Sequence, residues 1–196
     1  GRRQRRVSLE AVWFKRDLRV HDHAPLAGAA ATGRPVLCLY ILEPSLWARP
    51  EYSARQFAFL LETLDSLDAD LRRRGAQLTL RVGEALDVFA ALHAEHGLTA
   101  IRAHEETGLI QTWERDKAVA AWARSRGIAF LEQPQHGIIR GLKTRNGWAK
   151  KWDAFMGRAP VPAPERIPCA GLVSDEHRNA AALGLSPDPC PGRQPG

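Results

Sequence analysis

Cysteine is scarce in this 196-residue sequence, which contains only Cys38, Cys169 and Cys190. Cys38 falls inside a predicted buried strand, and the other two lie in a proline-rich tail without paired spacing. An odd number of cysteines without a repeated spacing argues against a disulfide framework and against a zinc or iron–sulfur site. We therefore expect a cytoplasmic protein with no metal centre.

Long apolar runs are also missing from the sequence. No uninterrupted stretch approaches the roughly 20 residues that a membrane-spanning helix needs. The arginine-rich start is not followed by the apolar core of a secretion signal. The sequence therefore predicts no association with a membrane.

A glycine-rich phosphate loop is absent as well. The sequence has neither Gly-x-Gly-x-x-Gly after its first predicted strand nor the Gly-x-x-x-x-Gly-Lys-[Ser/Thr] pattern, the two motifs that cradle phosphates with backbone N–H groups. The charged run Lys15-Arg16-Asp17-Leu18-Arg19 stands in that place. Its arginines offer planar donors suited to carboxylates, phosphates and polar ring edges. This exchange argues against a dinucleotide-dependent dehydrogenase.

The net charge of +6 is concentrated in the flanks of a chain that is 44% hydrophobic and 26% charged. Residues 1–6 and 133–158 are basic, whereas acids and bases nearly balance over residues 7–132. A basic flank can bind a polyanion such as DNA by releasing counterions. A solvated surface is the alternative, and it is the more usual role of a charge run.

Short apolar runs alternate with amphipathic stretches, a pattern typical of α/β folds. Helices are predicted to end at Gly33, Gly75, Gly97 and Gly127, since glycine suits a helix C-terminus. We predict a Rossmann-like, doubly wound, five-stranded parallel sheet, for which the fold type implies strand order 3-2-1-4-5. The predicted strands are 10–14, 36–42, 77–82, 99–103 and 128–131, and the predicted helices are 25–32, 52–74, 84–96 and 112–126.

The character of the sequence changes after residue 132. Residues 133–158 are predicted to be a basic helical extension in which Trp148 and Trp152 share a face. We favour packing of these tryptophans on the core over contact with a nucleic acid. Residues 159–196 are rich in proline and predict an extended interdomain linker. Because the chain starts without methionine and ends in a linker, we expect a fragment whose missing portion is a further domain.

The tripeptide His21-Asp22-His23 could suggest a metal site. Adjacent side chains on an extended loop diverge, however, and a metal needs convergent ligands. We therefore expect Asp22 to act instead as the N-cap of the helix that begins near Ala24-Pro25.

The segment from Val12 to Leu26 closely resembles the opening motif of the DNA photolyase/cryptochrome family. In that family, a strand ending in Trp-Phe precedes a basic-Arg-Asp-Leu-Arg run and then Asp-(Asn or His)-x-x-Leu, where this chain has His23. The resemblance extends through residues 33–44, 57–83 and 105–116. The pair Gln111-Thr112 departs from the Asn-Glu pair that helps to hold folate in some members.

The resemblance implies that residues 7–132 form an α/β domain that holds a light-harvesting pigment, followed by a linker and a helical FAD-binding domain. Nothing in this sequence corresponds to that last domain, so the implied fragment has no catalytic residues. The pigment would be a folate, a deazaflavin, FMN or a lumazine. The implied pigment-binding residues are Phe14, Lys15, Arg16, Asp17, Leu42, Glu43, Glu105 and Glu106.

The parent protein would resemble a monomeric flavoprotein that is either a deoxyribodipyrimidine photo-lyase acting on damaged DNA or a cryptochrome that signals in blue light. Two alternatives remain open. The chain could be a stand-alone α/β nucleotide-binding protein, or a non-catalytic DNA-binding module that uses its basic flanks. An absorbance spectrum separates these alternatives, because only the pigment-binding domain absorbs near-ultraviolet or blue light.

Overall fold

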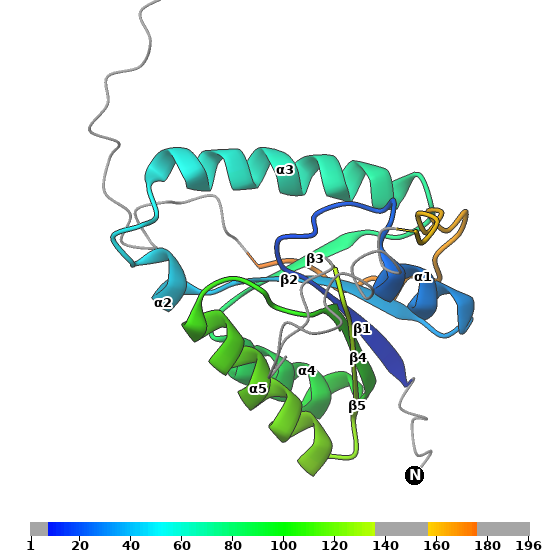
Figure 1. Ribbon diagram of the computed structural model, residues 1–196. Helices are drawn as coiled ribbons and strands as arrows, with labels where there is room; N and C mark the ends of the chain where they lie inside the picture. The colour runs from blue at the N-terminus through cyan, green and yellow to red at the C-terminus, as the bar shows by residue number, and fades with distance from the viewer. Residues whose placement is uncertain (1–7, 136–156, 176–196) are drawn as a thin grey trace, which may run out of the picture.

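The computed structural model describes residues 8–135 and 157–175 of the chain (Figure 1). All five strands are parallel and follow the order β3-β2-β1-β4-β5, which confirms the predicted fold class. The strands are β1 (Leu9–Phe14), β2 (Val36–Leu42), β3 (Leu78–Val82), β4 (Leu98–His104) and β5 (Ala129–Gln133). The helices are α1 (Ala24–Ala31), α2 (Pro44–Trp47), α3 (Ala54–Arg72), α4 (Ala85–His96) and α5 (Ile110–Ser125).

Helices cover both faces of the sheet, so its central strands β1 and β2 are buried along their whole length. Helices α1 and α3 pack on one face, and α4 and α5 pack on the other (Figure 1). Successive side chains of a strand point to opposite faces. Phe14 therefore joins the core under α1 and α3, whereas Trp13 joins the core under α4 and α5.

The start of α3 shows how the sequence fixes a helix boundary. Ser53 accepts a hydrogen bond from the Gln56 N–H, and the Gln56 side chain accepts one from the Ser53 N–H. This capping box satisfies two N–H groups that the first turn leaves free. The helix therefore begins at Ala54, two residues after the predicted start.

The predicted N-cap of α1 is wrong, because His23 rather than Asp22 occupies that position. The Leu26 N–H donates to His23 Nδ1 over 3.1 Å. Asp22 lies one residue earlier with a φ of 48°, in the left-handed region, and its carboxylate accepts from the Val161 N–H. Asp22 therefore ties the loop before α1 to the C-terminal segment instead of capping the helix.

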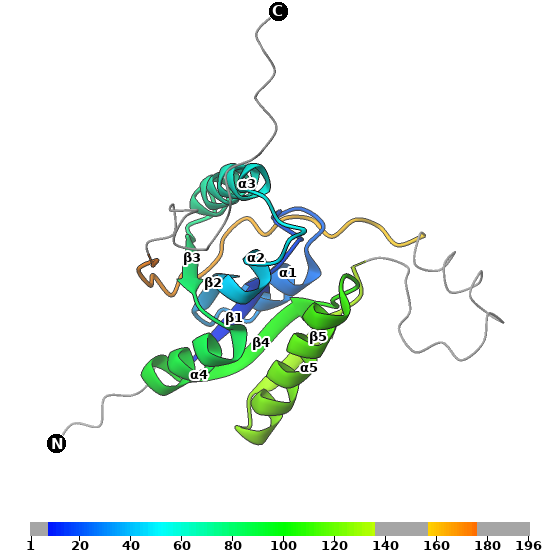
Figure 2. The same ribbon diagram turned by 90° about the vertical axis from the view of Figure 1, so that its left-hand side faces the viewer.

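The described C-terminal segment, residues 157–175, packs on the sheet. Its residues 167–175 run beside β3, which is the edge strand of the sheet among the described residues (Figure 2). The N–H groups of Leu80 and Val82 donate to the side chains of Ser174 and Asp175. We call residues 167–175 the edge strap. The strap covers unpaired backbone groups of the edge strand that could otherwise pair with a strand of another chain.

The predicted basic helix falls mostly within residues 136–156 and lies outside the described residues, as do residues 1–7 and 176–196. Within the part of the chain that the structure describes, no helix is long and apolar enough to cross a membrane.

Candidate functional site

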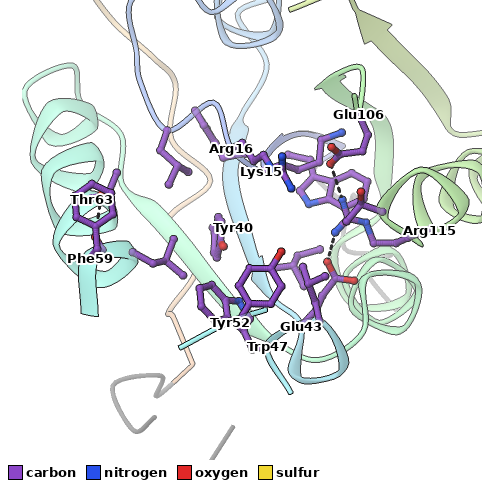
Figure 3. Close-up of a pocket in the computed structure, with 17 residues that line it drawn as sticks. Lys15, Arg16, Tyr40, Glu43, Trp47, Tyr52, Phe59, Thr63, Glu106 and Arg115 are labelled. Carbon is purple, nitrogen blue, oxygen red and sulfur yellow. Dashed lines mark hydrogen bonds and ion pairs between the residues drawn. The ribbon is translucent and has the colours of Figure 1, made fainter. Parts of the chain in front are cut away.

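A cavity of about 280 Å³ opens at the carboxyl ends of β1 and β2, next to the segment that follows β4 (Figure 3). This is the edge of a doubly wound sheet where ligands bind, beside the point at which strand order reverses. Aromatic and charged side chains share its walls. They include Trp13, Lys15, Arg16, Tyr40, Glu43, Trp47, Tyr52, Phe59, Glu106 and Arg115.

The aromatic wall comes from β1, β2 and the short helix α2. Trp47 stacks obliquely on Tyr52, with ring centroids 4.7 Å apart, and meets Phe57 edge-on at 5.6 Å. Burial holds the pKa of Tyr40 well above its ordinary value, so this cavity residue keeps its phenolic proton. The wall therefore offers planar contact surfaces and a neutral hydroxyl.

Lys15 is fixed at the base of the cavity by two strong contacts. Its Nζ donates to Asp116 Oδ2 over 2.6 Å and to the His104 carbonyl over 2.7 Å. The same ammonium lies 4.9 Å from the centroid of the Trp13 ring. Since Asp116 is buried, this ion pair has little exposure to solvent and holds the loop after β1 against α5.

Arg115 joins three buried carboxylates that come from different parts of the chain. Figure 3 shows two of these contacts, with Glu43 and Glu106. Its guanidinium bonds to Glu43 after β2, to Glu106 after β4 at 3.4 Å, and to Asp116 at 3.0 Å. Burial raises the pKa of Glu43, and the nearby Arg115 charge opposes that rise. Burial alone would lower the pKa of Arg115, but the charge of Glu43 and then of Asp116 raise it.

Arg16 differs from the other two cations because it is exposed at the cavity mouth. No hydrogen bond or ion pair ties it to another residue within segments 8–135 and 157–175. If residue 108 carried a Cβ, that atom would lie 2.9 Å from Arg16 Cζ and 2.7 Å from Glu106 Oε1. Glycine at position 108 therefore leaves room for Arg16 and Glu106, and Arg16 can accept an anion from outside.

The structure brings five of the eight sequence-predicted residues to this cavity: Phe14, Lys15, Arg16, Glu43 and Glu106. Three others do not line it. Leu42 is fully buried in the core under α3, Asp17 turns toward two histidines, and Glu105 uses its backbone N–H to bond the carbonyl of Gln133.

Tyr40, Trp47, Tyr52 and Arg115 are among the residues of the cavity wall that the sequence did not predict. Tyr40 could have been found, because it stands two residues before Leu42 on a predicted strand. Arg115 lies within residues 105–116, which resemble the family, but nothing in that segment marked it as a cavity residue. Trp47 and Tyr52 depend on helix α2, which the sequence did not predict.

Asp17 sits behind the cavity as the centre of a buried cluster. One carboxylate oxygen lies 2.7 Å from His104 Nδ1 and 2.6 Å from His23 Nε2, and the other accepts the Lys15 backbone N–H. The contact with His23 Nε2 is too bent for a good hydrogen bond, so it acts mainly through charge. Burial would raise the pKa of Asp17, but the hydrogen bond from His104 and the close contact with His23 hold it well below its ordinary value.

Asp17, His23 and His104 place three potential metal donors within 4.8 Å of one another. Two imidazoles and a carboxylate are a common set of ligands for zinc. His23 Nδ1, however, accepts the Leu26 N–H, so the neutral ring carries its proton on Nε2, the atom that faces Asp17. A protonated nitrogen cannot bind a metal, and the cluster therefore fits a hydrogen-bonded network better than a cation site.

The amino-acid sequence of this chain is similar to those of known proteins. The family model described as DNA photolyase matches residues 10–159. Cryptochrome-2 of Gallus gallus is 29% identical over 172 residues, which cover 84% of this chain and 29% of that protein. Cryptochrome DASH of Natronomonas pharaonis is 29% identical over 206 residues, which cover 95% of this chain and 43% of that protein. The chain thus spans less than half the length of these relatives.

Solved structures share the fold at lower identity. A class III photolyase from Agrobacterium tumefaciens superimposes with a TM-score of 0.72 at 21% identity, over 93% of this chain and 39% of that one. A photolyase from Sulfolobus tokodaii, described with two FAD molecules and the implication of a novel light-harvesting cofactor, gives a TM-score of 0.65 at 21% identity, over 89% of this chain and 40% of that one.

Proposed function

This chain belongs to the DNA photolyase family, and we propose that its α/β domain holds a light-harvesting chromophore in the cavity at the carboxyl edge of the sheet. One observation carries the proposal. A cavity with an aromatic wall and a charged loop after β1 lies where a nucleotide-binding protein of this architecture has its phosphate loop.

The donor set of the cavity suits a planar heteroaromatic pigment. Trp47 and Tyr52 supply ring surfaces, and the protonated Tyr40 hydroxyl can donate to a ring nitrogen or carbonyl. The volume of about 280 Å³ is near the lower end of ligand cavities, which run from roughly 300 to 1,000 Å³. The ring system would therefore fill the cavity, and the pigment's side chain would extend to the mouth.

The balance of charged side chains in the cavity supports a pigment with an anionic group. Lys15 and Arg115 already face Asp116, Glu43 and Glu106, so neither has spare charge for a ligand. Arg16 is exposed at the mouth and is the residue that we assign to the anion. A phosphorylated flavin fits these features, and Gln111-Thr112 weakens the case for folate held through an Asn-Glu pair.

When bound, the pigment absorbs near-ultraviolet or blue light and passes the excitation energy to a flavin. The chain's own residues enclose its rings, exclude water from them and fix its orientation. We propose that the full-length protein uses FAD for light-driven repair of damaged DNA or for blue-light signalling, in keeping with its photolyase and cryptochrome relatives.

An absorbance spectrum of the purified chain tests the proposed function. We expect an absorption band above the tryptophan band, either from pigment that copurifies or from added FMN that stays with the protein after gel filtration. A colourless protein that retains ATP would support the stand-alone nucleotide-binding alternative. Strongly salt-dependent binding of DNA without pigment would support the DNA-binding alternative.

Arg16→Gln should weaken FMN binding about tenfold, because it removes a charge-assisted hydrogen bond to the phosphate. Riboflavin, which lacks the phosphate, should bind the variant and the unchanged protein equally well. Arg126→Gln is the matched control, since it removes the same charge from an exposed arginine at the C-terminus of α5. If Arg16→Gln binds FMN as tightly as the unchanged protein does, Arg16 is not part of the binding site. Fluorescence quenching of the flavin measures both affinities.

A further inference from the structure

His23 has two tasks that require one protonation state. Its Nδ1 must carry a lone pair, because it accepts the Leu26 N–H at the start of α1. Its Nε2 must carry a proton, because it faces Asp17 Oδ2 at 2.6 Å. Only the neutral ring with its proton on Nε2 satisfies both contacts. The side chain is fully buried, so water cannot replace either partner.

The cluster around His23 is connected directly to the cavity. Asp17 accepts the backbone N–H of Lys15 over 2.8 Å, and Lys15 lines the cavity. The His23 ring also packs against Phe14, another lining residue, with centroids 4.7 Å apart. A change at His23 therefore reaches two residues of the cavity wall without contact between His23 and the ligand.

Charged and titratable groups face His23 from each element packed against it. Asp17 and Arg19 lie on the loop after β1, and His104 lies at the end of β4 with its ring centroid 4.6 Å away. Burial lowers the pKa of His23, and the Asp17 carboxylate only partly offsets that effect. The ring is therefore neutral at neutral pH and gains its second proton in acid.

We propose that His23 is a positioning residue for the chromophore cavity and that its protonation loosens the cavity. A proton on Nδ1 removes the acceptor for the Leu26 N–H, which opens the first turn of α1 and releases the loop that carries Asp17 and Lys15. The proposal rests on the chromophore function, since a released Lys15 matters most where a ligand fills the cavity.

A first experiment reads the tautomer of His23 without any pigment. Long-range ¹H–¹⁵N spectra of ¹⁵N-histidine-labelled protein should show Nε2 protonated and Nδ1 unprotonated at neutral pH. On acidification, the Lys15 backbone amide should shift with the same midpoint as the His23 ring. Protonation on Nδ1 in the neutral ring, or a Lys15 amide that does not follow His23, would overturn the proposal.

A second experiment separates the helix cap from the titration. His23→Asn keeps a good N-cap residue and removes the ionisable ring. FMN affinity of the unchanged protein should fall about tenfold as the pH is lowered through the midpoint of the His23 ring, whereas the asparagine variant should show a flat profile. The matched control is His21→Asn, an exposed histidine two residues away, which should keep the pH dependence.

The two experiments distinguish the two proposals. If FMN binds but its pH profile is the same in the unchanged protein and in His23→Asn, the positioning role of His23 is wrong and the chromophore function stands. If FMN does not bind at any pH, the flavin assignment fails, and the coupled shifts of His23 and Lys15 still decide the positioning role.

Discussion

Replacement of Arg115 by leucine will destabilise the domain by about 3–5 kcal/mol at neutral pH, because it leaves buried carboxylates without their shared cation. Arg115 is mostly buried and contacts Glu43, Glu106 and Asp116, each of which is less than a tenth exposed. After the substitution, Lys15 still pairs with Asp116. Glu43 and Glu106 lose their cation. Urea denaturation followed by circular dichroism measures the loss.

The sign of the pH dependence identifies the cause of this loss. Burial already raises the pKa of Glu43, and removal of Arg115 raises it further. A carboxyl with a raised folded pKa favours the fold below its unfolded pKa of 4.5, and this contribution is lost as the pH rises through the folded pKa. The deficit of Arg115→Leu should therefore shrink as the pH falls toward that range. A deficit that is constant with pH would show that lost packing, rather than unpaired charge, is responsible.

Two control variants bracket the effect. Arg115→Lys keeps the positive charge but cannot reach three carboxylates at once, so it should lose less stability than the leucine variant. Arg49→Leu breaks the exposed pair with Glu51 and should leave the free energy of unfolding unchanged within error. These comparisons separate the number of contacts from the charge itself.

Sheet order and strand positions could be predicted from the sequence because strands covered on both faces leave continuous apolar runs. Strand β2 begins and ends at the predicted residues, and β3 starts one residue later than predicted. Helix ends were less predictable. Helix α5 starts at Ile110 rather than Thr112, and its N-cap, Leu109, has no side-chain hydrogen bond that would mark the start in the sequence.

Helix α2 shows why part of the cavity was missed. The predicted strand ends at residue 42, directly before Glu43-Pro44, and proline is favoured in the first turn of a helix. A four-residue helix gives too short a periodic pattern to identify. Helix α2 carries Trp47, so this aromatic residue of the cavity wall could not be predicted from the sequence.

The direction of Asp17 could not be predicted for a different reason. It depends on His104, which is 87 positions away in the sequence and approaches only after β1 and β4 have paired. A carboxylate in a charged loop can face the ligand or a buried partner, and local sequence does not decide between them. Here two histidines compete successfully for Asp17, and Arg16 and Glu106 are left to form the rim.

The edge strap extends the folding unit beyond the region that the family model matches. Ile167 is 3% exposed and belongs to the core under α3, and the strap's Ala170 N–H bonds to the Val36 carbonyl at the start of β2. The family match ends at residue 159. A boundary chosen there would cut away a part of the core.

A chain that stops at residue 159 should therefore be less stable by about 3–5 kcal/mol than one that stops at 175, because it loses a buried isoleucine and exposes a strand edge. Ile167→Ala in the full chain should account for about 2–4 kcal/mol of that loss. Val173→Ala is the matched control in the same strap, since Val173 is 83% exposed and should lose nothing measurable. Equal stability of the two truncated chains would mean that the strap contacts the sheet without contributing to the free energy of unfolding. Unequal stability together with a neutral Ile167→Ala would assign the effect to the backbone hydrogen bonds at β3 instead of the core.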